Sequence, residues 1–432
     1  MTLEQAMEYI NNIPHIGKRD GVNRVRPLLH LLGDPQQHLR FVHVAGTNGK
    51  GSTVAMTASV LRQAGLRTGM FISPYVEDYR ERIQLDGAWI PPEDLAEEVE
   101  RLAPLCEQLR QQGHPVTEFE FDTALAMDYF ARKECDMVAL EVGMGGALDA
   151  TNAIDAPDVC AIASISFDHT QYLGDTLAQI AREKSGIIKL GSRVAIYPKE
   201  PPEALAVLQE ACQALLIQPN IPDLGQLEVL ECGEEGSRIR YKGRELHIPL
   251  LGEHQIYNAL TVCAIFEELD AAGWSFPWQT VAQGIAKASF NGRMEVVHRQ
   301  PLCLVDGAHN PDGVDSLCHT LDTLYRGRDV TVVMGMLADK DYAYGIRQVA
   351  SRASRFIATT PVGTPRALPA EQAAQAARPY CAQVEVIEAP SQAAQRALEL
   401  ALEHQGMAIA CGSLYMIGEA KQGFCSAAPL VD

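Results

Sequence analysis

One glycine-rich segment has the composition of a phosphate-binding loop. The sequence AGTNGKGS occupies residues 45–52, between a short apolar run and a helical pattern. Glycines let the backbone wrap around a phosphate, and the N–H groups at a helix start point towards it. Lys50, which we expect to be exposed, can reach the β- and γ-phosphates, and the Ser52 hydroxyl can bind Mg²⁺. Val44 and Gly51 depart from the G-x-x-x-x-G-K-[ST] pattern, and an ordinary tight turn is the alternative.

Two ionisable residues stand among apolar neighbours. Glu141 ends a buried-strand pattern, where a carboxylate needs a partner. That partner is either a Mg²⁺ ion or water beside the phosphate loop, or a helix cap or salt bridge. Lys184 follows Leu177 by seven residues on the apolar stripe of a helical pattern. It either snorkels or pairs with an acid, or it loses its proton easily and captures CO₂ as a metal-binding carbamate.

Further polar residues follow other predicted strands. Asp168 and His169 come after a third apolar run, and the sequence DGAHNP ends a run in the second half. Asp306 and His309 of that motif either cap the next helix or face the phosphate loop across a cleft. In the second case Arg293, in the sequence FNGR, binds a phosphate through two parallel hydrogen bonds. The residues alone leave both alternatives open.

The elements that must position these residues follow an alternating pattern. Buried strands are predicted at residues 41–45, 137–142, 159–166, 302–306, 329–337, 355–360, 382–389 and 406–415. Helices are predicted at 52–65, 121–134 and 255–271, a hairpin within 80–90 and a small antiparallel sheet at 226–250. The sequence therefore predicts an α/β protein with two domains. Residues 1–292 form a P-loop-type ATPase domain with a parallel sheet and a small antiparallel subdomain, and residues 293–432 form a Rossmann-like domain.

Composition excludes several classes of protein. The 432 residues are 47% hydrophobic and carry a formal net charge of −19, which disfavours a nucleic-acid binder that relies on a basic face. Eleven cysteines are scattered without a C-x-x-C pair, as expected of reduced thiols. The start MTLEQAMEYI lacks the features of a signal peptide, and no apolar run approaches 18 residues. We expect a cytoplasmic protein that binds neither nucleic acid nor membrane.

The motifs taken together resemble one family. The chain is similar to the folylpolyglutamate synthase/dihydrofolate synthase family of the Mur ligase superfamily, from about residue 15 to 420. The resemblance rests on GTNGKGS, ISPYVEDYRERI, TEFEFDTALA, EVGMGGALDATN, ISFDHTQYLG, IAREKSGIIK, HQIYNAL, NGR and DGAHNP, in that order. It implies an ATP-dependent amide ligase that phosphorylates a carboxylate to an acyl phosphate. The amino group of L-glutamate then attacks, with two Mg²⁺ ions assisting.

The resemblance also implies a role for each matching residue. The nucleotide site comprises Asn48, Gly49, Lys50, Gly51, Ser52, Asn258, Arg293 and Asp306. The catalytic residues are Lys50, His169, Lys184, Asp306 and His309. Metal ligands are Ser52, Ser73 and Glu141 for the first ion, and His169 with carbamylated Lys184 for the second. The pterin substrate lies near Gly21, Val22, Asn23, Thr117, Glu118, Phe119, Glu120, Leu148, Asp149 and Ala150.

Two positions depart from the family pattern on the substrate side. Ala147 stands where Arg is frequent, and Tyr75 stands where His is common. The resemblance implies that the substrates are L-glutamate and either dihydropteroate or a reduced folate. We expect both of these acceptors to be used, and we expect the protein to be a monomer. A Mur-type ligase for another carboxylate is the alternative, but such ligases usually carry an additional N-terminal domain, and only about 40 residues precede the loop. A non-catalytic nucleotide-binding protein has no use for Lys184 beside Glu141 and His169.

Overall fold

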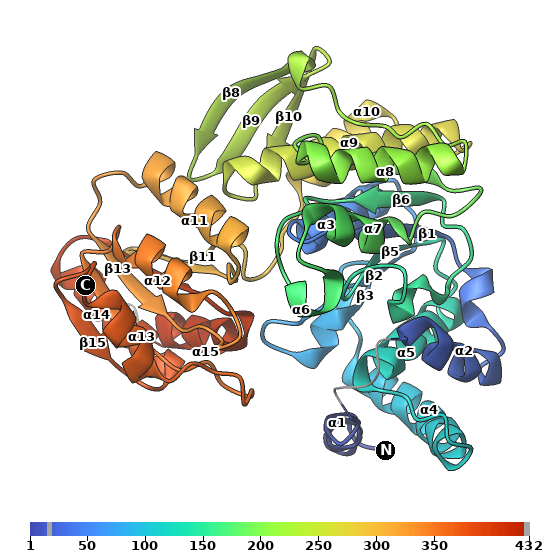
Figure 1. The fold of residues 1–432 in the computed structure, drawn as a ribbon, viewed down its shortest axis with the longest axis horizontal. Coiled ribbons are helices and arrows are strands. Elements are labelled where there is room, and N and C mark those ends of the chain that lie inside the picture. Colours follow the sequence, from blue (N-terminus) through green and yellow to red (C-terminus); the bar gives the residue numbers. More distant parts are fainter. Residues whose placement is uncertain (15–19, 427–432) are drawn as a thin grey trace.

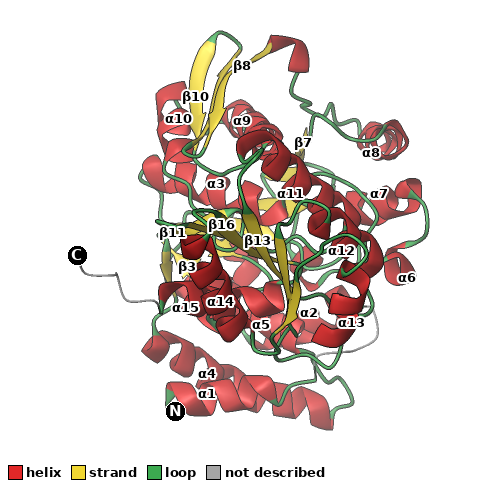
Figure 2. Ribbon diagram, turned by 90° about the vertical axis from the view of Figure 1, so that its left-hand side faces the viewer, coloured by secondary structure: helices red, strands yellow, loops and turns green. Residues whose placement is uncertain are grey.

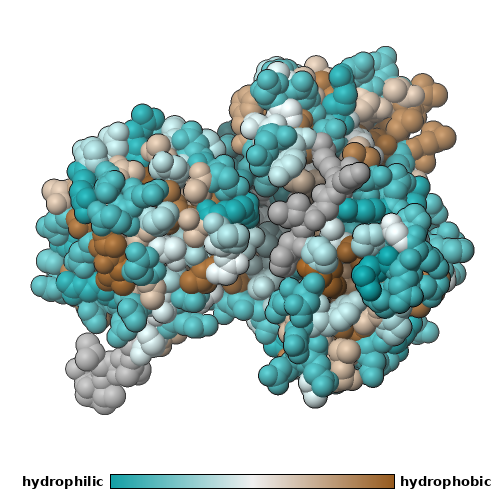
Figure 3. Space-filling view, turned by 60° about the horizontal axis from the view of Figure 1, so that its bottom comes forward, coloured by the Kyte–Doolittle hydropathy of each residue, from teal (hydrophilic) through white to brown (hydrophobic). Residues whose placement is uncertain are grey.

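A computed structural model describes residues 1–14 and 20–426. Two lobes lie side by side in Figure 1, each built around its own sheet, with a third, smaller sheet above the first lobe. The face shown in Figure 3 is mostly hydrophilic, in keeping with the net charge of −19. The mixed α/β architecture confirms the predicted fold class.

The first lobe contains a seven-stranded sheet that is parallel except at one edge. Its order is β4 (Ala88–Trp89), β3 (Ile83–Leu85), β2 (Thr68–Phe71), β5 (Met137–Glu141), β1 (Phe41–Ala45), β6 (Val159–Ile162) and β7 (Arg193–Ile196). The edge strands β3 and β4 form the predicted hairpin, and β3 pairs with β2 in the antiparallel direction. Central β1 pairs in parallel with β5 and β6, so the carboxyl ends of all three strands meet at one edge.

Apolar helices cover both faces of this sheet. One face packs against α3 (Lys50–Gln63), α9 (Glu253–Ala271) and α10 (Trp278–Ala286). The other packs against α1 (Leu3–Asn11), α2 (Gly21–Leu31), α4 (Pro92–Gln111) and α5 (Glu118–Arg132). Figure 2 shows α1 and α4 side by side at the base of the molecule. Beyond β6 and β7 lie α6 (Thr170–Leu173), α7 (Leu177–Ser185) and α8 (Pro202–Ala214).

The small sheet and the second lobe follow the predicted plan. Strands β8 (Leu227–Gly233), β9 (Gly236–Tyr241) and β10 (Arg244–Ile248) form the antiparallel sheet. The sheet of the second lobe has the order β11 (Glu295–Arg299), β12 (Leu302–Asp306), β16 (Met407–Cys411), β13 (Val330–Met334), β14 (Arg355–Ala358) and β15 (Val384–Val386), with only β11 antiparallel to its neighbour. Helices α11 (Pro311–Leu324), α12 (Tyr342–Ala350) and α13 (Ala370–Ala377) cover one face, and α14 (Pro390–Glu403) and α15 (Leu414–Cys425) cover the other.

The third predicted strand is shorter in the structure than in the sequence pattern. Strand β6 ends at Ile162, although the apolar run continues to residue 166. The chain leaves the sheet there and follows the glycine-rich segment: Ser164 accepts hydrogen bonds from the backbone N–H groups of Thr47 and Asn48, at 2.7 and 3.2 Å. The prediction was wrong about the strand's end because apolar composition does not distinguish a strand from a buried strand-to-loop connection.

Candidate active site

The glycine-rich segment forms the connection between β1 and α3. Gly49 has a left-handed backbone with φ of 81°, and a Cβ atom there would lie 2.5 Å from Oδ1 of Asn258. A Cβ atom at Gly51 would lie 2.4 Å from the ring of Phe290. A side chain at either position would therefore have to displace its neighbour, and at Gly49 it would also have to adopt the left-handed backbone that favours glycine.

Lys50 begins helix α3 rather than lying in an exposed loop. Its side chain keeps 16% of its surface exposed, so the expectation of an exposed lysine was wrong. The ammonium group donates to the carbonyl of Thr47 at 3.2 Å and lies 4.0 Å from Oε1 of Glu141. The loop backbone folds under this side chain, which places its charge at the helix N-terminus where a phosphate would bind.

Helix α9 supplies two buried amides to the same place. Gln255 donates to the hydroxyl of Ser52 at 3.2 Å, and Asn258 donates to Oε1 of Gln255 at 3.0 Å. All three side chains are buried. Asn258 was predicted and Gln255 was not, although three residues separate them on one helical face, which was the available clue.

Glu141 lies at the carboxyl end of β5, beside β1. Its side chain is 4% exposed, and Oε2 accepts a hydrogen bond from the backbone N–H of Ser73 at 3.2 Å. Burial raises the pKa of Glu141, and the charges of Lys50 and Arg293 oppose that rise. The carboxylate thus joins the phosphate loop to the segment that follows β2.

Lys184 is buried where helix α7 passes beneath the phosphate loop. A capping box formed by Thr176 and Gln179 starts this helix, and Ile180 and Ala181 anchor it in the core. The Lys184 ammonium, 3% exposed, donates to the carbonyl of Gly46 at 2.7 Å. Burial, reinforced by the charge of Lys50, lowers its pKa to about 7. A substantial fraction of Lys184 is therefore the neutral amine near pH 7.

Asp168 connects the two lobes, and His169 follows it in the chain. Asp168 pairs with Lys340, accepts from Asn310 Nδ2 at 3.0 Å and lies 3.7 Å from Nε2 of His309. Burial alone would raise the pKa of Asp168, but the hydrogen bond from His309 and the charges of His169 and Lys340 hold it well below its usual range. The His169 ring is 39% exposed, yet the protein around it removes enough water to lower its pKa to about 4.

The start of α11 touches the phosphate loop directly. Asn48 donates to Oδ2 of Asp312 at 2.6 Å, and Asn310 donates to Oδ1 of Asn48 at 3.0 Å. Asn310 also caps α11 through the backbone N–H of Gly313. Sequence reasoning missed Asn310 and Asp312 as partners of the loop and Lys340 as the partner of Asp168, because only the placement of the second sheet brings them there.

Asp306 organises the turns around it. Its two oxygens accept from the backbone N–H groups of Met294 and Ala308, each at 2.8 Å. Burial raises its pKa, and the charge of Arg293 opposes this. A Cβ atom at Gly307 would lie 2.9 Å from Nη1 of Arg293, so that guanidinium crosses the strand end. The charge of Arg293 acts on Glu141, and Nε2 of His309 lies 3.7 Å from Asp168, so residues of the second lobe approach the carboxyl ends of the first sheet.

The segments predicted to hold the pterin substrate converge on the other side of β5. Gly21 packs against Leu148 and Ala150, where a Cβ atom would lie 2.8 Å from the backbone nitrogen of Ala150, and Val22 donates to the carbonyl of Leu148 at 3.3 Å. Asn23 bonds Asp20 instead of this segment. Gly21, Val22, Leu148 and Ala150 are thus brought together by main-chain packing.

The start of α5 completes this group of segments. Thr117 and Glu120 form a capping box, and Glu120 also accepts from Arg24 at 2.6 Å. Glu118 lies 3.7 Å from Arg82. Sequence reasoning missed both arginines, because their acidic partners lie far away in the chain.

Phe119 and Asp149 face the glycine-rich loop after β5. The Phe119 ring lies against Gly143, where a Cβ atom would be 2.4 Å from Cζ. Asp149 is buried, and its carboxylate accepts hydrogen bonds from Met144 and Thr151. These two residues therefore shape the loop between the predicted substrate segments.

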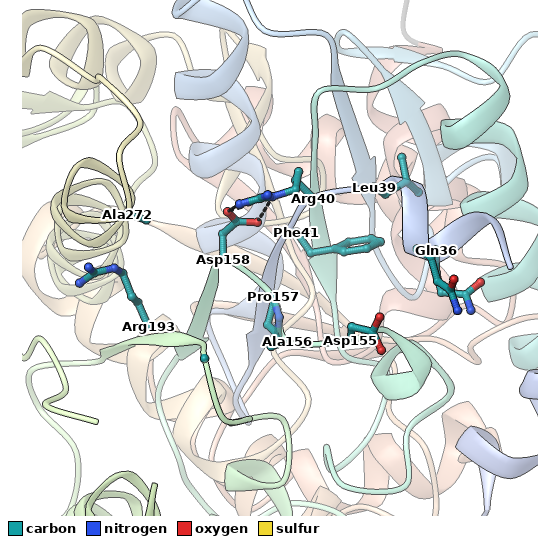
Figure 4. Close-up of a pocket in the computed structure, with 12 residues that line it drawn as sticks. Gln36, Leu39, Arg40, Phe41, Asp155, Ala156, Pro157, Asp158, Arg193 and Ala272 are labelled. Atoms are coloured by element: carbon teal, nitrogen blue, oxygen red, sulfur yellow. Dashed lines mark hydrogen bonds and ion pairs between the residues drawn. The ribbon is translucent and has the colours of Figure 1, made fainter. Parts of the chain in front are cut away.

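A separate pocket lies at the opposite, amino ends of the strands (Figure 4). Its two arginines are already neutralised: Arg40 forms a bidentate pair with Asp158, and Arg193 bonds Glu268 and the carbonyl of Ala271. The pocket therefore offers no uncompensated charge to a phosphate. In parallel sheets ligands bind at the carboxyl ends, which is where the phosphate loop lies.

Within residues 1–14 and 20–426, no cluster of three or more His, Cys, Asp and Glu side chains has the arrangement of a metal site. A metal in the cleft would therefore need hydroxyl, phosphate or modified-lysine oxygens as well. In the same described part of the chain, no helix is long and apolar enough to span a membrane.

Comparisons with known proteins cover most of the chain. Residues 44–266 match the Mur ligase middle domain, and residues 292–414 match the glutamate ligase domain of Mur ligases. The chain is 35% identical over 378 residues to the folylpolyglutamate synthase of Lacticaseibacillus casei, covering 85% of this chain and 88% of that protein. It is 35% identical over 356 residues to the dihydrofolate synthase/folylpolyglutamate synthase of Bacillus subtilis, covering 80% and 82%.

A solved structure extends the likeness to the whole fold. The folylpolyglutamate synthase of Mycobacterium tuberculosis, complexed with ADP and AMPPCP, superposes with a TM-score of 0.87 at 30% identity, covering 98% of each chain. The arrangement of both lobes is therefore shared with a protein that binds adenine nucleotides.

Proposed function

This chain belongs to the folylpolyglutamate synthase family of the Mur ligases, and from that premise we propose that it uses ATP to join L-glutamate to a pterin-bearing carboxylic acid. One observation carries the proposal: the phosphate loop, which lies on Lys184, and Asp168 beside it contact residues of the second lobe directly. A ligase of this kind needs both sides, because it must hold a nucleotide and a carboxylate in reacting geometry. Adenine-nucleotide binding is supported by the complex of the mycobacterial relative.

The chemistry proceeds in two transfers. A carboxylate is a poor electrophile, so the γ-phosphoryl group of ATP is first transferred to the acceptor carboxylate, giving an acyl phosphate and ADP. The amino group of L-glutamate then attacks the acyl carbon, and the tetrahedral intermediate expels inorganic phosphate and leaves an amide. Lys50, at the start of α3, and Arg293, at the end of the linker, place positive charge beside the transferring group.

The residues present fit two Mg²⁺ ions, with one condition. Hydroxyl and carboxylate oxygens are the ligands that Mg²⁺ prefers, and Ser52, Ser73 and Glu141 supply them for the first ion. His169 and Lys184 hold the second ion only if Lys184 is a carbamate, because an ammonium group cannot bind a cation. Its lowered pKa provides the neutral amine that reacts with CO₂. When bound, the ions neutralise charge on the transferring phosphoryl group.

Both lobes contribute to the nucleotide site. Asn258, on α9 of the first lobe, contacts the loop at Gly49, and Asp306 of the second lobe holds the turns that carry Arg293 and His309. We place the boundary between domains at residues 292 and 293. This boundary is supported by Phe290, which still packs on the phosphate loop, and by strand β11, which starts at Glu295 and belongs to the second sheet.

The pterin lies among the segments around Gly21, Thr117 and Leu148, which pack together beside β5. Ala147 adds no cation there, and its methyl group packs closely on Gly186. Tyr75 is 36% exposed and lies against the guanidinium of Arg82, 5.1 Å from ring centre to charge. The segment from Ser73 to Arg82 therefore presents the aromatic ring of Tyr75 to the acceptor, while Arg82 beneath it is paired with Glu118 and Asp122.

We propose that both dihydropteroate and reduced folates are acceptors. The Bacillus subtilis relative is named for both reactions and the Lacticaseibacillus casei relative for chain extension. The benzoate of dihydropteroate and the γ-carboxylate of a folate lie at different distances from the pterin. Serving both requires two pterin positions or movement of the segment from Ser73 to Arg82.

The decisive experiment measures phosphate release by the purified protein with ATP and L-glutamate. Dihydropteroate and tetrahydrofolate are supplied separately, and each product is identified by mass as the acceptor plus one glutamate. Turnover with both supports the proposal in full, and turnover with tetrahydrofolate alone restricts it to chain extension. Turnover with neither acceptor, but with another carboxylate, would instead indicate a different Mur-type ligase.

We further propose a monomer in the cytoplasm. Its partners are then small molecules, with neither nucleic acid nor membrane involved. The cysteines support a reducing compartment, because all are free and most are buried in the part of the chain that the structure describes.

A further inference from the structure

A histidine that the proposed chemistry does not use lies in the middle of strand β1. His43 is fully buried, and its Nε2 atom lies 2.9 Å from the hydroxyl oxygen of Thr151. Its Nδ1 atom has no hydrogen-bond partner among the described residues. Burial, with a contribution from the charge of Lys189, lowers the pKa of His43 to about 3, so the ring is neutral.

The hydrogen bonds around Thr151 define which nitrogen of His43 carries the proton. The Thr151 hydroxyl donates its one hydrogen to Oδ1 of Asp149 at 2.6 Å. It can therefore only accept from His43, so the proton of the neutral ring lies on Nε2. Asp149 also accepts from the backbone N–H groups of Thr151, at 3.0 Å, and Met144, at 2.9 Å. A directed chain of hydrogen bonds thus runs from β1 through Thr151 and Asp149 into the loop after β5.

The loop held by this chain lies between two parts of the candidate site. At one end, Gly143 has room for no side chain because the Phe119 ring lies against it. At the other end, Ala147 donates to the carbonyl of Glu183 at 2.9 Å, and a Cβ atom at Gly146 would lie 3.0 Å from Cα of Lys184. A shift of this loop therefore displaces both the surface beside Phe119 and the helix that carries Lys184.

We propose that His43 is a positioning residue which, through Thr151 and Asp149, fixes the 143–150 loop for acceptor binding. The proposal deepens the proposed function and rests on it for the identity of the acceptor. The chain of hydrogen bonds ends in the loop beside Phe119, whereas it reaches the phosphate loop only indirectly, through the helix whose Lys184 bonds Gly46, so nucleotide binding is affected less than acceptor binding.

The principal test replaces the hydroxyl in the middle of the chain. Thr151→Val keeps the shape but can neither accept from His43 nor donate to Asp149, whereas Thr151→Ser keeps both functions. Thr331→Val is the matched control, because Thr331 is a fully buried threonine in the second sheet whose hydroxyl has no partner in the described structure. We expect Thr151→Val to raise the KM for the acceptor at least about tenfold, as expected for losing a hydrogen bond to a buried carboxylate. The KM for ATP should change less than threefold, and Thr151→Ser and Thr331→Val should match wild type.

Variants of His43 test the direction of the chain. His43→Gln retains a donor in the place of Nε2 and should restore most of the acceptor affinity that His43→Leu loses. Unchanged acceptor KM in both Thr151→Val and His43→Leu overturns the proposal, as does an equal rise in the KM for ATP and acceptor.

A spectroscopic measurement is independent of the reaction. In protein labelled with ¹⁵N-histidine, His43 should be the neutral tautomer protonated at Nε2 throughout pH 6–8, and Thr151→Val should shift its resonances. A ring protonated at Nδ1 or charged at pH 6 overturns the proposed direction. Wild-type protein that uses neither pterin acceptor refutes the proposed function, and this tautomer measurement then still decides the hydrogen-bond chain.

Discussion

Replacing Lys184 by Met should remove a rise of stability with pH while abolishing ligation. In wild-type protein the ammonium is buried, and its pKa falls from 10.5 in water to about 7. The unfolded chain therefore holds a proton that the folded chain has released between pH 7 and 10.5. Stability must rise with pH across this window, by about 5 kcal/mol in total at about 1.4 kcal/mol per pKa unit. Methionine has similar length and no proton, so the variant lacks this dependence.

The hydrogen bond that Lys184 donates contributes to the stability of wild-type protein, in opposition to the desolvation penalty. Its donation to the carbonyl of Gly46, at 2.7 Å, is lost in Lys184→Met, which costs about 1–3 kcal/mol. At pH 7 the gain from removing a poorly solvated cation exceeds this loss, so the variant should be more stable by about 2–4 kcal/mol. At pH 10 the order reverses, because a neutral lysine carries almost no desolvation penalty and only the lost hydrogen bond remains.

The assay is urea unfolding of both proteins from pH 6.5 to 10 in CO₂-free buffer. The difference between them at each pH isolates Lys184, because the other titrating groups are shared. At pH 7–8 added bicarbonate should then stabilise wild type but not Lys184→Met, since only a neutral amine forms a carbamate and Lys184 is largely protonated in the unfolded chain at this pH. Parallel pH profiles for the two proteins would refute the buried-amine reasoning, and ligase activity in the variant would refute the role of Lys184.

Two further predictions concern the cleft. Lys50→Ala should lower turnover about a hundred- to a thousandfold in a coupled ADP-release assay, because one cation leaves the transferring phosphoryl group; near-wild-type ADP release would exclude Lys50 from the site. Lys340→Met and Asp168→Asn should show a coupling energy of about 1–3 kcal/mol in a double-mutant cycle of urea unfolding, because the pair is largely buried between the lobes; strictly additive effects would mean that the pair does not hold the lobes together.

The elements that the sequence predicts correctly carry their information locally. The phosphate loop, Glu141 and Lys184 each follow or lie on a strand or helix whose apolar pattern is complete within about a dozen residues. Lys184 was recognisable because it interrupts an apolar stripe at helical spacing. Burial of that stripe then follows from the amphipathic pattern alone, and the structure places the lysine at 3% exposure.

Strands β2, β7 and β11 were not predicted from the sequence, and β2 and β11 lack a buried apolar run. Strand β2 has the sequence TGMF, and β11 has the sequence EVVHR. Each of these two becomes a strand because a neighbour, β5 or β12, offers it a partner. Such pairing depends on tertiary context, which outweighs the weak intrinsic preference of these segments.

The contacts across the cleft are unpredictable for a related reason. Asp168 meets Lys340 and Asn310, which lie more than 140 residues away in the chain. Nothing local distinguishes these polar side chains from solvated ones, because each lies in a loop or at a helix start. Their partnership follows from how the two sheets face each other, and a single sequence does not specify that placement.

Asp306 shows how structure resolves a question that residue types leave open. A carboxylate at a strand end suits either a helix cap or a ligand site, and both uses need an aspartate at that position. Here Asn310 caps α11, while both oxygens of Asp306 are taken by the backbone of Met294 and Ala308. Met294 directly follows Arg293 in the chain, and Ala308 directly precedes His309. The buried carboxylate of Asp306 therefore sets the spacing of Arg293 and His309, which lie towards Glu141 and Asp168 respectively. Asp306 contributes to the site by holding these two neighbours.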